Sequence, residues 1–179
     1  MERASSLAGK RSKGRVVSAA RAAVHAGLAT LPAICAVFHE PGEGERLDAG
    51  ATEIVIKATG EDTGGTFFLA ESTIPPGFPG PPPHTHETLT DMFYVLEGTM
   101  TFHLGGVLRT AGPGTFVCVA PREVHTFSNA TDQPVRFLNL STPSGWERYM
   151  RELAAAGRQG PLTPATIGEI ASRHDFRVA

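Results

Sequence analysis

Short runs that alternate hydrophobic and polar residues fill the middle of the chain. The run at 52–59 (TEIVIKAT) alternates, and the run at 65–74 (GTFFLAESTI) is rich in aromatic and β-branched residues. Five further apolar runs follow, and each is bounded by Gly, Pro, Asn or Asp: 91–98, 100–106, 114–121, 124–130 and 134–143. Strands that recur at short intervals, with turn residues between them, are typical of an all-β sandwich or barrel. The pattern therefore predicts an all-β domain, either a sandwich or a barrel, over residues 38–143.

The period of the pattern changes after the last of these runs. The segment 145–157 ends at a glycine and has its large apolar residues at helical spacing: Trp146, Tyr149, Met150 and Leu153. The segment 163–176 begins with Thr163, a good N-cap residue, followed by Pro164, which suits the first helical position. We expect residues 144–179 to form one or two amphipathic helices that pack on the barrel and cover an open edge or its mouth.

Charge is distributed unevenly between the N-terminal segment and the rest of the chain. Residues 1–37 hold six of the sixteen Lys and Arg residues but one of the eighteen acidic residues. We expect them to form a flexible basic arm. The remainder is mildly acidic, which disfavours nucleic acid as a partner.

The N-terminal segment also has the order of a secretory signal, a basic part followed by a weakly apolar one. Its apolar part is poor in leucine, is interrupted by His25 and Pro32, and is short for a spanning helix. Two cysteines, Cys35 and Cys118, are too few for a disulfide framework, and we expect Cys118 to be buried in its apolar run. We therefore expect a cytoplasmic protein with no membrane partner.

Histidines stand at strand positions in two of the blocks bounded by glycine and proline. His84 and His86 are separated by one residue, so in a strand both side chains point to the same face. Asp91 is five residues after His86, so in a regular strand its side chain points to the opposite face. A turn or bulge at the polar residues 87–90 could return Asp91 to the face of the histidines. With His125 from the second block, these side chains suit Fe, Mn, Ni, Zn or Cu. Histidines exposed on a strand or packed in a core would explain the same spacing without a metal.

Both blocks resemble the paired motifs of the cupin superfamily. The first is 79–98 (PGPPPHTHETLTDMFYVLEG), and the second is 114–129 (GTFVCVAPREVHTFSN). The resemblance spans about residues 50–142, and it is to the quercetin-dioxygenase-like and polyketide-pathway branches in particular. It implies a jelly-roll barrel (a double-stranded β-helix), a homodimer, and one divalent transition metal held by four residues: His84, His86, Asp91 and His125. This chain has Asp91 where the family has glutamate and Glu123 where it has glycine.

The resemblance also implies a metalloenzyme that acts on a small organic molecule. Its chemistry would be O2-dependent and of the quercetin dioxygenase type, on an enol- or phenol-like substrate. Two alternatives stay open: a non-redox cyclase, isomerase or lyase of polyketide metabolism, and a cupin that binds a small ligand without catalysis. Glu87 is a further candidate for acid–base catalysis, although a solvated surface acid explains it more simply. We expect Phe93 and Phe116 to belong to the core and Tyr94 to face away from it.

Overall fold

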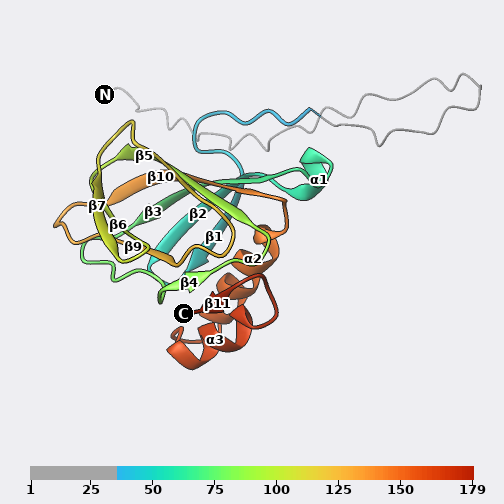
Figure 1. Cartoon of the computed structure of the whole chain (residues 1–179). Helices are drawn as coiled ribbons and strands as arrows, with labels where there is room; N and C mark the ends of the chain where they lie inside the picture. Colours follow the sequence, from blue (N-terminus) through green and yellow to red (C-terminus); the bar gives the residue numbers. More distant parts are fainter. Residues whose placement is uncertain (1–35) are drawn as a thin grey trace, which may run out of the picture.

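The computed structural model, which describes residues 36–179, is built around two antiparallel sheets (Figure 1). The first sheet has six strands in the order β1 (Glu45–Ala49), β2 (Thr52–Ala58), β3 (Phe68–Ile74), β10 (Val135–Thr142), β5 (Thr90–Glu97) and β8 (Phe116–Val119). The second has five, in the order β11 (Arg177–Val178), β4 (His84–Thr85), β9 (His125–Ser128), β6 (Met100–Leu104) and β7 (Val107–Ala111). The prediction of an all-β jelly-roll barrel is confirmed. The expected basic arm lies outside the described residues, except for its last two positions.

Buried and accessible residues alternate along the strands, and the buried ones fill the space between the sheets. In β5 the inner face carries Asp91, Phe93 and Val95, which are all at most 5% exposed, whereas Tyr94 between them is 43% exposed. Phe93 packs against Phe102 of β6, with ring centroids 5.2 Å apart. The predictions that Phe93 lies in the core and that Tyr94 faces outward are confirmed.

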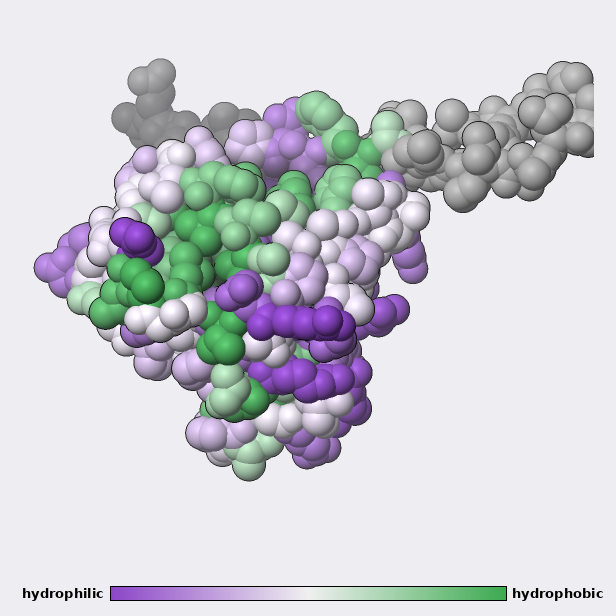
Figure 2. Space-filling view, viewed as in Figure 1, coloured by the Kyte–Doolittle hydropathy of each residue, from purple (hydrophilic) through white to green (hydrophobic). Residues whose placement is uncertain are grey.

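The edge strand β8 turns two residues outward that the sequence pattern places in the core. Phe116 is 60% exposed and Cys118 is exposed, so the burial prediction for both is wrong. Phe116 pairs with Tyr94 and Cys118 pairs with Met92 in the ladder, and residues paired in this way share one face of a sheet. Both side chains therefore lie on the outer face, and apolar surface gathers over the barrel strands in Figure 2.

Helices α2 (Trp146–Gly157) and α3 (Pro164–Ala171) lie against one end of the barrel, and the short helix α1 (Gly60–Thr63) joins β2 to β3 (Figure 1). α2 packs on β1 through a buried cluster that includes Leu47, Tyr149 and Leu153. These contacts hold the helix over the mouth of the barrel because they remove its apolar face from water. Among the helices of residues 36–179, none is long and apolar enough to cross a bilayer.

The C-terminal part of the predicted second helix is not helical. Thr163 caps α3 as expected, since its hydroxyl accepts a hydrogen bond of 3.1 Å from the backbone N–H of Thr166. The helix ends at Ala171, so the expected continuation to residue 176 is wrong. The chain instead turns back toward the barrel and adds β11 to the edge of β4. This return brings residues 172–179 next to the histidines.

Candidate metal centre

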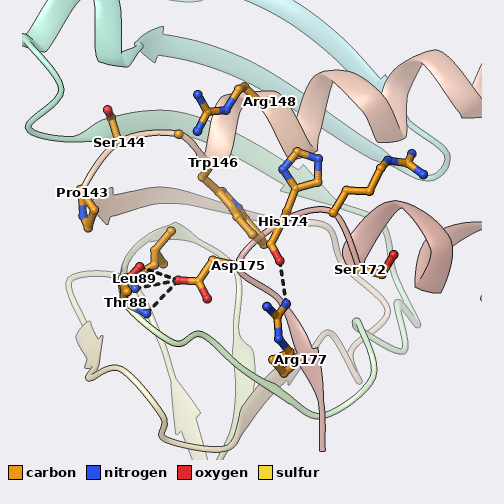
Figure 3. A pocket seen from close by; sticks show the side chains of 12 residues that line it. Thr88, Leu89, Pro143, Ser144, Trp146, Arg148, Ser172, His174, Asp175 and Arg177 are labelled. Atoms are coloured by element: carbon orange, nitrogen blue, oxygen red, sulfur yellow. Dashed lines mark hydrogen bonds between the residues drawn. The ribbon is translucent and has the colours of Figure 1, made fainter.

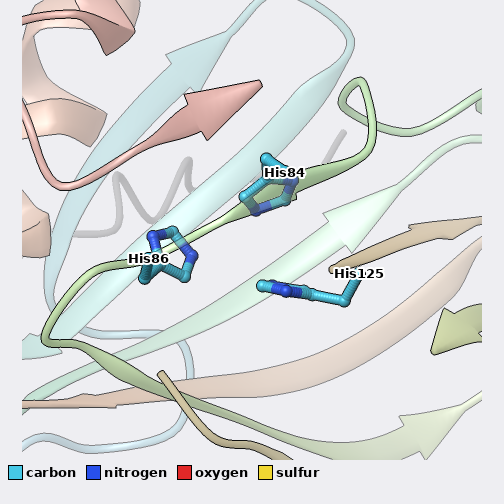
Figure 4. A group of neighbouring side chains, drawn as sticks. All are labelled: His84, His86 and His125. Carbon is cyan, nitrogen blue, oxygen red and sulfur yellow. The ribbon is translucent and has the colours of Figure 1, made fainter. Parts of the chain in front are cut away.

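Three histidines from two neighbouring strands converge inside the barrel (Figure 4). His84 lies in β4 and His86 directly after it, while His125 opens β9 and is the register partner of His84. All three are between 2% and 3% exposed. One ring nitrogen from each lies within 4.8 Å of those of the other two. Three imidazoles at this separation can ligate one transition-metal ion.

Backbone carbonyls orient the three rings. The Nδ1 atom of His84 lies 2.9 Å from the carbonyl oxygen of Pro82, and that of His125 lies 3.0 Å from the carbonyl oxygen of Glu123. The Nδ1 atom of His86 is hydrogen-bonded to the carbonyl oxygen of Asp175. A carbonyl can only accept, so each Nδ1 carries a proton, and in the neutral ring the Nε2 atom then presents its lone pair.

The Nε2 atoms provide the test of whether a metal fits. Those of His86 and His125 are fully buried, and neither has a hydrogen-bond partner among the described residues. Buried polar atoms are otherwise almost always hydrogen-bonded. Burial lowers the pKa of His84 to about 3, reinforced by the positive charge that His125 would carry, and burial also lowers the pKa of His86. The rings of His84 and His86 are therefore neutral at pH 7, the form that binds a metal, and the donor set fits one.

Asp91 lies beside two of the three histidines. Its Oδ2 atom is 3.7 Å from Nε2 of His125 and 3.9 Å from Nε2 of His86, and its side chain is buried. Its Oδ1 atom accepts a hydrogen bond of 2.6 Å from Nδ2 of Asn139 on β10. The group whose ligand atoms all lie close together contains the histidines alone. Direct ligation by Asp91 thus stays a prediction.

The turn that brings Asp91 to the face of the histidines depends on Asp175, a residue that was not predicted from the sequence. The carboxylate of Asp175 accepts hydrogen bonds from the backbone N–H groups of Thr88 (2.9 Å) and Leu89 (3.0 Å), and also from that of Glu87. These donors hold the irregular turn between β4 and β5. Burial alone would raise the pKa of Asp175, but the N–H donors outweigh it and lower that pKa. No local motif marks this residue, because its partners lie more than 80 residues earlier in the chain.

Two aromatic side chains close the centre toward the helices, and neither was predicted from the sequence as part of the site. The ring of Phe176 stacks on His84 with centroids 4.1 Å apart and an interplanar angle of 7°. The indole of Trp146 lies edge-on to His86 at 4.9 Å. Beyond them lies a cavity of about 610 Å³ between the start of α2, the 88–89 turn and the segment from Ser172 to Arg177 (Figure 3).

Glu87 is not brought together with the histidines. Its side chain is 55% exposed and forms an ion pair with Arg122, whose Nε donates to it at 2.9 Å. Arg122 also explains how the turn of the second motif forms without the glycine that the family has there. It adopts a left-handed conformation, with φ of 70°, and its backbone N–H donates to the carbonyl oxygen of His86 at 2.7 Å. The turn before His125 therefore uses Arg122 rather than Glu123 as its left-handed residue.

The comparisons with known proteins agree with this architecture. Residues 70–141 match the family model described as a Cupin domain. The quercetin 2,3-dioxygenase of Bacillus subtilis (strain 168) is 32% identical over 114 residues, which cover 64% of this chain and 33% of that protein. The chain thus spans about a third of the length of the curated relative it matches.

Solved structures with low sequence identity share the fold. KdgF from Halomonas sp. superposes with a TM-score of 0.56 at 18% identity, over 63% of this chain and 98% of that one. A predicted oxalate decarboxylase from Thermotoga maritima gives a TM-score of 0.53 at 22% identity, over 60% of this chain and 98% of that one. At these identities the likeness concerns the fold alone.

Proposed function

The chain carries a cupin domain, and from that premise we propose that the domain holds one divalent transition metal at His84, His86 and His125. The observation that carries the proposal is the pair of buried Nε2 atoms, on His86 and His125, without a hydrogen-bond partner among the described residues. When bound, the ion would supply Lewis-acid chemistry, and redox chemistry as well if it is Fe, Mn or Cu.

The chain's own residues would prepare the site. The carbonyl partners of the three Nδ1 atoms fix each ring, so no imidazole has to reorient on binding. Burial keeps the rings of His84 and His86 neutral and excludes water from the centre. Asn139 fixes one oxygen of Asp91 and leaves the other facing the histidines.

As the reaction we propose oxidation of a small organic molecule by O2, of the dioxygenase type. The relatedness to a quercetin 2,3-dioxygenase supports this class. A non-redox cyclase, isomerase or lyase is the second candidate, and Asp91 favours it. A buried carboxylate 3.7 Å from His125 Nε2 can take up a proton from a bound substrate as a general base, which needs no oxygen.

Elemental analysis of protein purified without added metal tests the centre. We expect one equivalent of a transition metal in the wild type, and loss of most of it in His84→Ala and in His86→Ala. The matched control is His103→Ala, which removes an accessible histidine on β6 and should keep the metal. Full metal retention in both site variants would refute the assignment.

Turnover under anaerobic conditions separates the two reaction classes. The metal-loaded protein is incubated with a panel of enols and phenols, with and without O2. Product that forms only with O2 supports the dioxygenase class, whereas the same turnover without O2 refutes it in favour of the non-redox class. Binding without turnover in either condition would point to a ligand-binding cupin.

A further inference from the structure

The inner faces of β5 and β10 change from apolar to polar at the level of the histidines. In β10 the inward residues Val135 and Phe137 are followed by Asn139 and Ser141. β5 runs antiparallel to β10, and its first inward residue, Asp91, is the register partner of Ser141. The three polar side chains are at most 5% exposed. The first sheet thus presents a small polar surface to the metal centre, formed by Asp91, Asn139 and Ser141.

Ser141 differs from the other two residues of this polar surface, because its hydroxyl has no partner within the described part of the chain. Asn139 donates a hydrogen bond of 2.6 Å to Oδ1 of Asp91, and Oδ2 of Asp91 lies 3.7 Å from Nε2 of His125. The Ser141 side chain is fully buried, and no residue in 36–179 forms a hydrogen bond with its Oγ atom. Buried hydroxyls without a partner are rare, because an unpaired polar group costs free energy. The hydroxyl therefore requires a polar atom from outside the described residues.

The buried side-chain atoms without a partner are grouped in the fold. Within residues 36–179 they are Nε2 of His86, Nε2 of His125 and Oγ of Ser141. Asp91 connects them, because its Oδ2 atom lies 3.9 Å and 3.7 Å from the two nitrogens and its backbone pairs with that of Ser141. Directly paired residues on one face of a sheet have Cβ atoms about 4.5–5.5 Å apart. The hydroxyl and the two imidazoles therefore border the same part of the barrel interior.

These three atoms suit different kinds of partner. The Nδ1 protons of His86 and His125 are held by carbonyl oxygens, so in the neutral rings the Nε2 atoms offer lone pairs, which suit a cation. A serine hydroxyl can donate as well as accept, and it bonds most strongly to an acceptor that carries negative charge. Three protein ligands leave at least one coordination position on a transition metal open to an anion or a substrate oxygen. A ligand atom that binds the metal and accepts from Ser141 would therefore satisfy all three buried atoms.

We propose that Ser141 binds the substrate, by donating a hydrogen bond to the substrate atom that coordinates the metal. This contact favours an atom with negative charge, such as the oxygen of an enolate or a phenolate, over a neutral one. Phe68, the register partner of Ser141 on β3, is fully buried beside it, and exclusion of water strengthens the hydrogen bond. The inference rests on the proposed metal centre, since it concerns a ligand of the same ion.

Azide binding to the cobalt-substituted protein tests this contact, because azide is a small anion and the visible spectrum of cobalt(II) reports a new ligand. The full-length wild type and Ser141→Ala are loaded with cobalt, and the cobalt content of each is measured before the azide titration. The variant should hold one equivalent of cobalt, as the wild type does, and bind azide about tenfold more weakly, as expected for loss of a hydrogen bond to a charged group. Equal azide affinity at equal cobalt content would overturn the proposal.

Ser72→Ala is the matched control, because Ser72 is a buried serine on the inner face of β3. It lies four residues beyond Phe68, or about 13 Å along the strand. This variant should keep its cobalt and the azide affinity of the wild type. If it weakens azide binding as much as Ser141→Ala does, the assignment to Ser141 is refuted. A wild type that binds no cobalt would instead refute the metal centre together with this inference, so the cobalt content distinguishes the two failures.

A crystal structure of the zinc-loaded wild type, soaked with azide, gives a second measurement that does not depend on the folding of a variant. We expect a zinc ligand, either an azide nitrogen or a solvent oxygen, within about 3.2 Å of the Ser141 Oγ atom. Zinc held by the histidines, with no azide or solvent ligand in contact with Ser141, would overturn the proposal.

Discussion

Replacement of Asp175 by alanine should loosen the turn that places the histidines. The carboxylate accepts hydrogen bonds of 2.9 Å and 3.0 Å from the backbone N–H groups of Thr88 and Leu89, a further one from Glu87, and one of 2.9 Å from the Thr88 hydroxyl. Glu87 and Thr88 are exposed, so water can replace part of what is lost. We therefore count about 1 kcal/mol for each of the three backbone donors, or about 3 kcal/mol in all.

This loss predicts a melting temperature lower by about 6–12 °C for a chain of this length. The same change should weaken metal binding by about 10- to 100-fold, because His86 depends on the position of the Asp175 backbone for its Nδ1 partner. Asp175→Asn should lie between alanine and the wild type, since its amide keeps one acceptor oxygen. Calorimetry of the metal-free protein measures stability, and competition with a zinc chelator measures affinity.

Asp132→Ala is the matched control, because Asp132 is an exposed aspartate in the loop before β10. It should leave both quantities unchanged. The reasoning is refuted if Asp175→Ala melts within about 2 °C of this control and also binds zinc with wild-type affinity. If Asp175→Ala lowers the stability but leaves the zinc affinity unchanged, Asp175 stabilises the turn without being needed to orient His86.

Three further predictions concern protonation, backbone strain and the carboxylate of the centre. The pKa of His84 is about 3 in the folded chain and 6.5 in the unfolded one, so the metal-free protein should lose about 1.4 kcal/mol of stability per pH unit as pH falls below 6.5. Urea unfolding at pH 7.0 and 5.5 measures this loss, and equal stability at both would contradict it. Arg122→Gly should be more stable than Arg122→Ala by about 1 kcal/mol, since both lose the Glu87 ion pair but glycine alone adopts φ of 70° without strain. No difference between the two in thermal melts would argue against strain at this turn. Asp91→Glu should shift metal affinity by at least about tenfold, because one more methylene moves the carboxylate relative to Asn139. An unchanged affinity in chelator competition would remove Asp91 from the ligands.

Local sequence patterns predicted the parts of the fold that depend on alternation within one strand. The runs that became β3, β5 and β10 have a buried and an accessible face, and their residue types show it. Strands β1, β7 and β11 were not predicted, because they are mostly exposed and carry no alternation that burial would impose. Their pairing is set by neighbours that lie elsewhere in the chain.

The histidines could be predicted for the same reason, while their surroundings could not. His84 and His86 share a strand face, so their convergence follows from local geometry. Asp175 and Phe176 reach the centre only because the chain turns back after α3 and pairs with β4. Phe116 shows the opposite error: its residue type suggests a core position, but its register with Tyr94 at the sheet edge turns it outward.

The hydrogen bond between His86 and the Asp175 carbonyl makes metal occupancy and docking of the C-terminal segment linked equilibria. If an ion binds more tightly when the His86 ring is held by the Asp175 carbonyl, then bound metal must stabilise the docked C-terminal segment by the same factor, because the coupling between two equilibria is reciprocal. Amide hydrogen exchange of the turn that Asp175 holds, at Thr88 and Leu89, should therefore slow as metal is added.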